Sequence, residues 1–169
     1  LKEKDISTLK DLRHFLQQHP ELSGQEVNTA SNSQVHQSAA THQLIQQLGG
    51  YGVLANWKGK KTGPNLLFRA ELDALPISEK NDIPYASQNS GISHKCGHDG
   101  HMTISLADSS VNRIGLESGS VSLLFQPAEE NGQGAKAILE DSWFKELSFD
   151  HAFALHNIPK VELGHILSK

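Results

Sequence analysis

The chain has 169 residues, which is enough for one domain with its own core and too few for two. Its 15 Lys and Arg against 19 Asp and Glu give a net charge of −4, so a nucleic-acid partner is not expected. No apolar run is close to the length of about 18 residues that a membrane-spanning helix needs. A single cysteine, Cys96, excludes an internal disulfide framework. The polar amino terminus lacks a signal-peptide pattern, and one unpaired cysteine suits a reducing interior, so we expect a cytoplasmic protein.

The amino-terminal quarter predicts two helices with a polar stretch between them. Residues 3–19 carry apolar side chains three and four positions apart, as in an amphipathic helix, and His19-Pro20 ends this pattern. Residues 27–38 are polar and predict a loop or a solvated extension of a helix. A second helix is predicted over residues 38–48, with Gly49-Gly50 as its carboxyl-terminal cap.

The middle of the chain predicts strands first and a helix later. Apolar runs at Val53–Trp57 and Leu66–Ala70 are typical of strands, and a Gly- and Lys-rich turn at 58–64 separates them. Residues 76–95 contain prolines and a glycine and predict irregular structure. A helix is predicted over residues 100–114.

The last third alternates strands with a helix. Ser120–Phe125 and His151–Leu155 are apolar runs that predict buried strands, and Gly134–Glu140 predicts a short helix between them. Gly164–Leu167 predicts the beginning of another strand. Helices alternating with buried strands indicate an α/β fold with a layered sheet.

The densest group of potential metal ligands is the segment 94–101, HKCGHDGH, which lies in a loop before a helix. Cys96 and His98 are two positions apart, so in an extended segment both side chains face the same way. A thiolate and an imidazole on one face suit a borderline-soft divalent ion such as zinc, and Asp99 could orient a histidine. The alternative is a solvated loop that happens to be rich in histidine.

Two further groups follow apolar strands. Glu129 and Glu130 come after the strand that ends at Phe125, and His156 comes after HAFAL. Ligand sites in open α/β sheets form outside the carboxyl ends of strands, so one glutamate could bind metal while the other acts as a general base. The alternatives are a polar turn with two solvated acids and a structural histidine.

Asp73 follows the predicted strand 66–70 and could orient a metal ligand or accept a hydrogen bond from one. The alternative is an ordinary acid in a loop after a strand. Four other histidines have no evident partner in the sequence and are expected at the surface: His14, His36, His42 and His165.

Five sequence motifs, taken together, resemble one protein family. HPELSGQE, FRAELDALPI, SHKCGHDGHM, LLFQPAEENGQGA and FALHNIP are similar, in this order, to segments of the metal-dependent amidohydrolases of the aminoacylase and carboxypeptidase superfamily. The most similar branch contains hippurate hydrolase, N-acyl-amino-acid amidohydrolases and indole-acetyl-amino-acid hydrolases. The resemblance covers nearly the whole chain and implies a layered α/β/α catalytic domain of the metallopeptidase type.

The resemblance also implies a role for each matching residue. Cys96, His98, Glu130 and His156 correspond to metal ligands, and Glu129 corresponds to the general base. Asp73 matches a catalytic aspartate near the site. The family's centre holds two divalent ions, zinc or manganese and possibly nickel or cobalt, and hydrolyses the amide bond of a small N-acyl amino acid or a related conjugate.

Members of this family continue beyond the HNIP histidine into an inserted dimerisation domain and then return with one more metal-binding histidine. We therefore interpret residues 1–169 as the amino-terminal part of a single catalytic domain. The resemblance implies a homodimer for the full-length protein. For this chain alone we expect little or no hydrolysis, together with self-association through uncovered apolar faces.

Two other functions fit the sequence less well. The first is a non-catalytic metal-binding or interaction remnant of the same fold, which would have no use for Glu129 as a base. The second is a cysteine hydrolase with Cys96 as its nucleophile. His98 is too close along the loop to serve it easily as a base, and the two glutamates would then have no role.

Overall fold

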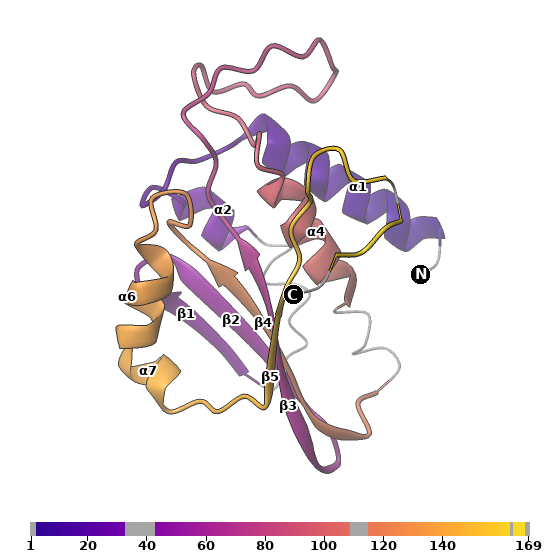
Figure 1. The fold of residues 1–169 in the computed structure, drawn as a ribbon, viewed down its shortest axis with the longest axis vertical. Helices are drawn as coiled ribbons and strands as arrows, with labels where there is room; N and C mark the ends of the chain where they lie inside the picture. Colours follow the sequence, from indigo (N-terminus) through magenta and orange to yellow (C-terminus); the bar gives the residue numbers. More distant parts are fainter. Residues whose placement is uncertain (1–2, 33–42, 109–114, 163, 168–169) are drawn as a thin grey trace.

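A mixed sheet of five strands forms the centre of the computed structural model, which describes residues 3–32, 43–108, 115–162 and 164–167 (Figure 1). The strand order is β1-β2-β4-β3-β5. The strands are β1 (Gln43–Leu48), β2 (Gly52–Lys58), β3 (Lys61–Glu71), β4 (Ser118–Gln126) and β5 (His151–Ala154). The helices are α1 (Glu3–Gln18), α2 (Val27–Ser31), α4 (His98–Asp108), α6 (Gly134–Glu140) and α7 (Ser142–Lys145).

Strands β3, β4 and β5 are parallel neighbours. Glu71 of β3 pairs with Gln126 of β4, and Arg69 of β3 pairs with Ala154 of β5. Strand β2 runs antiparallel to β4, and β1 runs antiparallel to β2. The carboxyl ends of three parallel strands therefore meet at one edge of the sheet, where their following loops lie next to one another.

The sheet lies between two helical layers (Figure 1). Alternating side chains of a strand face opposite sides, so Val53 and Ala55 of β2 join a core with α1 and α4. Leu54, between them, joins a second core with Ile138 of α6. The predicted layered α/β/α architecture is confirmed.

Most of the predicted elements are present. Helix α1, strands β2, β3 and β4, and helices α4 and α6 cover their predicted ranges to within a few residues, except that β3 begins earlier, inside the predicted turn. Residues 109–114 of the helix predicted over 100–114 lie outside the described residues. The segment 76–95 is irregular as predicted, with one isolated bridge from Leu75 to Ser93.

The helix predicted over residues 38–48 is wrong for its described part, which is strand β1. Ile45 and Leu48 are both buried, and their spacing of three imitates a helical pattern. The register of β1 against β2 shifts between Gln46 and Leu48, and Gln47 takes a positive φ of 62°. This bulge adds one residue and turns both apolar side chains toward the core.

Three smaller predictions also need correction. The segment 27–38 is not wholly solvated, because α2 forms within it and buries Thr29; residues 33–38 lie outside the described part. Strand β5 is an edge strand with exposed side chains rather than a buried strand. Residues 164–167 form no strand, and helix α7 was not predicted. Among the described residues, no helix is long and apolar enough to cross a membrane.

Candidate metal centre

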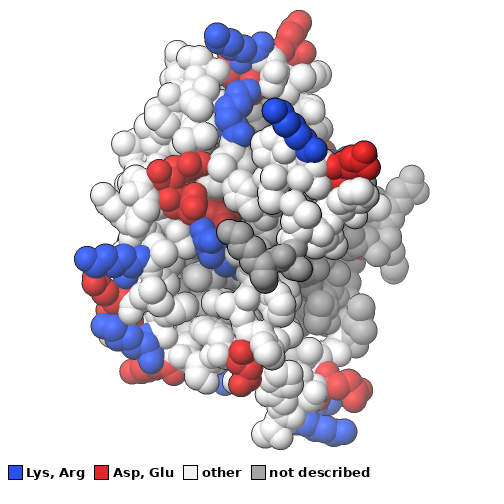
Figure 2. Space-filling model, in the orientation of Figure 1, with Lys and Arg blue, Asp and Glu red and all other residues white. Residues whose placement is uncertain are grey.

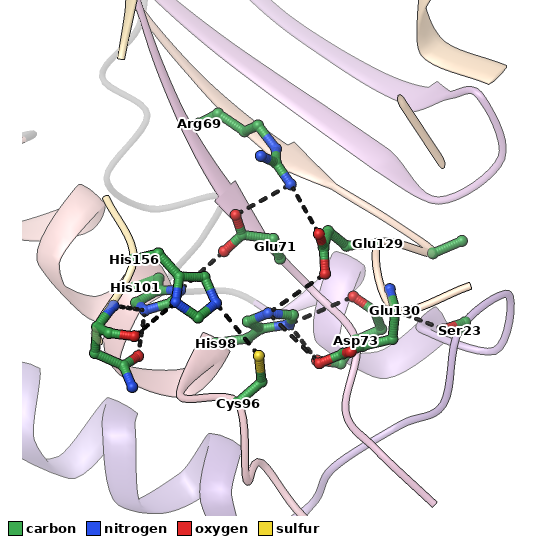
Figure 3. A network of polar contacts seen from close by, with 12 residues as sticks. Ser23, Arg69, Glu71, Asp73, Cys96, His98, His101, Glu129, Glu130 and His156 are labelled. Atoms are coloured by element: carbon green, nitrogen blue, oxygen red, sulfur yellow. Dashed lines mark hydrogen bonds and ion pairs between the residues drawn. The ribbon is translucent and has the colours of Figure 1, made fainter. Parts of the chain in front are cut away.

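All six residues singled out in the sequence lie at the edge of the sheet where β3, β4 and β5 end (Figure 3). Each comes from a loop that follows one of these strands, from the loop before α4 or from the first residue of α4. They are Asp73 after β3, Cys96 in the loop before α4, His98 at the start of α4, Glu129 and Glu130 after β4, and His156 after β5. Figure 2 shows acidic side chains gathered at this edge, with a basic side chain beside them.

Cys96, His98 and His156 form the first group of possible ligands. Their ligand atoms all lie within 4.8 Å of one another, and Cys96 Sγ is 3.3 Å from His156 Nε2. Gly97, between Cys96 and His98, has a positive φ of 96°, and a Cβ atom there would clash with the side-chain amide oxygen of Asn157. The glycine therefore lets the loop carrying His156 approach the loop carrying Cys96.

Hydrogen bonds to the backbone set the orientation of both histidines. His98 Nδ1 donates to the carbonyl oxygen of Asp73 at 2.8 Å, and His156 Nδ1 donates to the carbonyl oxygen of Asn157 at 2.8 Å. In each ring the Nε2 lone pair is left to face the site. Metal-binding histidines use this arrangement, in which the second nitrogen is held by a neighbouring oxygen.

Glu129 and Glu130 approach His98 from the other side. Glu129 Oε2 lies 3.8 Å from His98 Nε2, and Glu130 Oε1 lies 3.7 Å from the same atom. The three form a second possible ligand group that shares His98 with the first. The Glu129 side chain is 34% exposed and that of Glu130 is 18% exposed, so Glu129 is the more open of the two to an incoming molecule.

Asp73 is fully buried beneath these loops. Its Oδ2 accepts hydrogen bonds from Ser23 Oγ at 2.6 Å and from the backbone N–H of Glu130 at 2.9 Å. Burial by itself would raise the pKa of Asp73, but the His98 imidazole, whose Nδ1 lies 3.5 Å from Asp73 Oδ1, and the hydrogen bonds from Ser23 and the backbone N–H groups outweigh it and lower the pKa to about 2. Asp73 is therefore a fixed carboxylate that holds His98 and the Glu130 backbone together.

Burial, together with the neighbouring carboxylates, holds the Cys96 thiol in its protonated form. Burial and the neighbouring Glu130 and Glu129 carboxylates raise the pKa of Cys96 to about 12. A nucleophilic cysteine needs the opposite environment, since the thiolate is the reactive form. The cysteine-hydrolase alternative therefore loses support, although His156 lies within hydrogen-bond distance of the sulfur.

Sequence reasoning missed a buried pair beside the site, Glu71 and His101. His101 Nδ1 donates to Glu71 Oε2 at 2.9 Å, and His101 Nε2 lies 2.8 Å from Asn157 Oδ1. The pair thus connects β3 and α4 with the loop that carries His156. The spacing contained a signal, because Glu71 is two positions before Asp73 on an extended segment and His101 is three after His98 on a helix.

Arg69 extends this chain of contacts to Glu129. Its Nη2 lies 3.2 Å from Glu71 Oε1 and 3.7 Å from Glu129 Oε1. Burial would raise the pKa of Glu71, but the His101 hydrogen bond and the charge of Arg69 outweigh it and lower the pKa. Glu71 is therefore a charged bridge between His101 and Arg69.

The remaining histidines have other surroundings. His94 is buried, and burial lowers its pKa to about 4; neither ring nitrogen has a hydrogen-bond partner among the described residues. His14 is half-buried and stacks on Tyr85 rather than lying free at the surface, whereas His165 is exposed as expected. His36 and His42 lie outside the described residues.

The residues present fit a divalent cation. Within the described ranges, buried atoms left without a hydrogen-bond partner include His98 Nε2, Glu130 Oε1 and Asp73 Oδ1, all at this site. Four carboxylates gather there, those of Glu71, Asp73, Glu129 and Glu130, and the Arg69 guanidinium contacts only the first and the third, so negative charge exceeds positive charge at the site. Imidazole, thiol and carboxylate donors together match the preference of zinc and similar ions.

The fold and the site together define an α/β/α domain with a group of potential metal ligands at the carboxyl ends of its parallel strands. Comparison with known proteins identifies the family: the model described as Peptidase family M20/M25/M40 matches residues 67–168, which is more than half of the chain. The chain belongs to this family, as the sequence motifs predicted.

Relatives and solved structures agree with this assignment. The chain is 37% identical over 168 residues to an N-acetyl-L-cysteine deacetylase of Bacillus subtilis, covering 96% of this chain and 40% of the relative. It is 34% identical over 148 residues to the hippurate hydrolase of Campylobacter jejuni, covering 88% of this chain and 39% of that enzyme. The crystal structure of B. subtilis YXEP, described as a dinuclear metal binding peptidase from the M20 family, superposes with a TM-score of 0.85 at 34% identity, covering 96% of this chain and 46% of that one.

The chain therefore spans about 40% of the length of the curated relatives that it matches.

Proposed function

We propose that this chain carries most of the metal site of an amidohydrolase that cleaves the amide bond of small N-acyl amino acids or related conjugates. The observation that carries the proposal is the convergence of Cys96, His98 and His156, with Glu129 and Glu130 facing the same His98 nitrogen. Family membership supports the reaction class, and relatives named deacetylase and hippurate hydrolase support the substrate class.

In this proposal Cys96, His98, Glu130 and His156 hold the metal. When bound, divalent ions would polarise the amide carbonyl and stabilise negative charge that develops on its oxygen. The family relative with a dinuclear centre supports two ions for the whole protein, and zinc, manganese, nickel and cobalt all suit these ligands.

Glu129 acts as the general base and then as the general acid. Its Oε2 faces the site while Arg69 lies near its Oε1, so one oxygen is available to take a proton from the attacking water. The same carboxyl group then gives the proton to the leaving amine nitrogen. Asp73 positions His98 and the Glu130 backbone through its hydrogen bonds and does not exchange a proton.

We also propose a place for this chain in the whole protein. Residues 1–169 form the amino-terminal part of one catalytic domain, and the whole protein is a cytoplasmic homodimer that acts on a small molecule. The chain alone has little or no activity and tends to self-associate, since Phe153 and Leu155 beside the site are about half exposed.

Elemental analysis of the purified chain after incubation with zinc or manganese tests the metal site. We expect about one or more ions per chain, their loss in Cys96→Ala, and their retention in the control Ser90→Ala, which changes an exposed residue of the same loop. An unmodified chain without metal, or a Cys96→Ala variant that binds as well as the control, contradicts the proposed centre.

Glu129→Gln separates the enzyme from a non-catalytic metal-binding remnant. In the whole protein, this variant should keep its metal and lose hydrolysis of an N-acyl amino acid by a factor of about 100 or more. Unchanged hydrolysis would remove Glu129 from the role of base. Absence of hydrolysis from the unmodified, metal-loaded whole protein would favour the remnant.

A further inference from the structure

The segment 19–26, HPELSGQE, contributes no residue to the proposed catalytic set but contacts both loops that carry its acids. Leu22 forms a parallel bridge with Ala74, and the backbone N–H of Ala74 donates to the Glu21 carbonyl oxygen at 2.8 Å. The segment therefore lies alongside the loop that carries Asp73. Ser23 adds the 2.6 Å hydrogen bond from its hydroxyl group to Asp73 Oδ2.

Glu26 connects the same segment to the loop that carries Glu129 and Glu130. Its side chain is fully buried, and its Oε1 accepts a hydrogen bond from the backbone N–H of Ala128 at 2.7 Å. Within the described part of the chain, its Oε2 has no hydrogen-bond partner. The contact joins residues that are 102 positions apart in the sequence.

Ala128 is held in a conformation that it would not adopt by itself. Its φ is +49°, in the left-handed region that residues with a Cβ seldom occupy. The carbonyl oxygen of Ala128 accepts a hydrogen bond from Gly134 N at 3.0 Å, so both backbone polar groups of this residue are engaged. Because Ala128 directly precedes Glu129, its conformation sets the direction in which the two glutamates leave the strand.

Glu26 is itself held firmly. The Glu21 carboxylate accepts hydrogen bonds from the backbone N–H groups of Asn28 and Thr29, and from the Thr29 hydroxyl group, at the start of α2. Helix α2 begins at Val27, directly after Glu26. The Glu26 backbone is therefore fixed from the Glu21 side and through α2.

We propose that Glu26 is a positioning residue that sets the conformation of the Ala128 turn and thereby the placement of Glu129 and Glu130. This inference rests on the proposed function. A carboxyl group buried with a single hydrogen bond from a backbone N–H contributes little to stability, because removing this polar group from water offsets what one hydrogen bond returns. Its specific effect is on the geometry of the turn.

The test uses two variants of Glu26 and two control variants, all in the 169-residue chain. Glu26→Ala removes the acceptor, and Glu26→Gln keeps a carbonyl oxygen that can accept from Ala128 N–H. Gln25→Ala is the matched control, since Gln25 is the exposed neighbour of Glu26. Ile45→Val is a second control, which weakens the core at the far edge of the sheet.

Two measurements are made on each variant. The first is hydrogen exchange at the Ala128 and Glu130 amides by NMR in the presence of a chelator, which needs no metal. The second is a titration with cadmium ions, followed by the thiolate-to-metal absorption that reports Cys96. We expect Glu26→Ala to accelerate exchange at Ala128 about tenfold or more and to weaken cadmium binding about 10- to 100-fold.

Glu26→Gln and both controls should stay within a factor of about three of the unmodified chain in both measurements. If Glu26→Ala leaves the exchange rate of the Ala128 amide unchanged, the inference is overturned, whether or not the cadmium affinity changes. Equal losses in Glu26→Gln and Glu26→Ala, or faster exchange with unchanged cadmium affinity, also overturn it. A further outcome is that exchange at the Ala128 amide is fast in Glu26→Ala and as slow in Glu26→Gln as in the unmodified chain, while no chain binds cadmium. This outcome supports the positioning role of Glu26 and contradicts the proposed metal centre.

Discussion

Replacement of Asp73 by asparagine tests how the site is held together in the absence of metal. The Asp73 carboxylate accepts hydrogen bonds from Ser23 and from the Glu130 backbone, and its main-chain oxygen accepts one from His98. Asparagine has nearly the same shape, but it carries no charge and offers one acceptor oxygen in place of two. The variant therefore removes the charge and one acceptor oxygen while nearly keeping the shape, and only the charge contribution depends on pH between pH 6 and pH 3.

The magnitude follows from the pKa of Asp73, which is about 2 in the folded protein against an ordinary value of 3.8. Because the folded-state pKa is depressed, this group stabilises the folded protein above pH 3.8, and the contribution is lost as the pH falls through 2. At about 1.36 kcal/mol per pH unit, the gap corresponds to about 2 kcal/mol at pH 6 and about 1 kcal/mol at pH 3.

Urea denaturation of both chains between pH 6 and pH 3, with a chelator present, measures this contribution. Asp73→Asn should be less stable by about 2 kcal/mol or more at pH 6, and the difference should shrink by about 1 kcal/mol on acidification to pH 3. Asp82→Asn, at an exposed position in the irregular loop, serves as the control. A difference between unmodified chain and Asp73→Asn that stays constant across this pH range would refute the reasoning.

Three further predictions concern the buried groups. In the presence of a chelator, the Cys96 pKa of about 12 should reduce its thiolate fraction about 1,000-fold relative to a thiol of pKa 9.0. Alkylation of Cys96 by iodoacetamide at pH 8 should be slower by a similar factor. An alkylation rate like that of free cysteine would contradict the raised pKa. A double-mutant cycle of Glu71→Gln and His101→Gln should give a coupling of about 1.5–3 kcal/mol in denaturant titrations, and strict additivity would show that their hydrogen bond is not formed. Phe125→Ala, at a fully buried position, should cost about 3–5 kcal/mol by the same assay, and a cost below about 1 kcal/mol would place Phe125 outside the core.

The sequence predicted the long helices and strands well. It failed at β1, where a bulge gives the buried residues the spacing that is typical of a helix. Helix α1 and strand β4 have strong patterns that match the buried face of each element. Strand β1 lacks the alternating pattern of a strand, because the bulge at Gln47 places its buried residues Ile45 and Leu48 three positions apart and not two. A bulge depends on pairing with β2, which no local pattern reports.

At the candidate site, the sequence predicted the proposed ligands but not the residues that support them. The residues predicted as ligands all carry side chains with metal-binding chemistry. Glu130 and His156 follow strands, and Cys96 and His98 lie two positions apart where the chain enters α4, so their type and position were evident from the sequence. The supporting groups were not: Glu71 meets His101 across 30 positions, and Glu26 meets Ala128 across 102. Such contacts join elements that are distant in the chain, and their residue types alone carry no indication of a partner.

The sequence by itself determined the chemistry available to this protein: its family, its α/β class and the kinds of donor at the candidate centre, which are thiol sulfur, imidazole nitrogen and carboxylate oxygen. The tertiary structure alone decided which nitrogen of His98 and His156 faces the site and that the Cys96 thiol is held protonated. The physical reason is that tautomer, pKa and turn conformation depend on burial and on hydrogen bonds between distant segments. Those surroundings exist only once β3, β4 and β5 lie side by side.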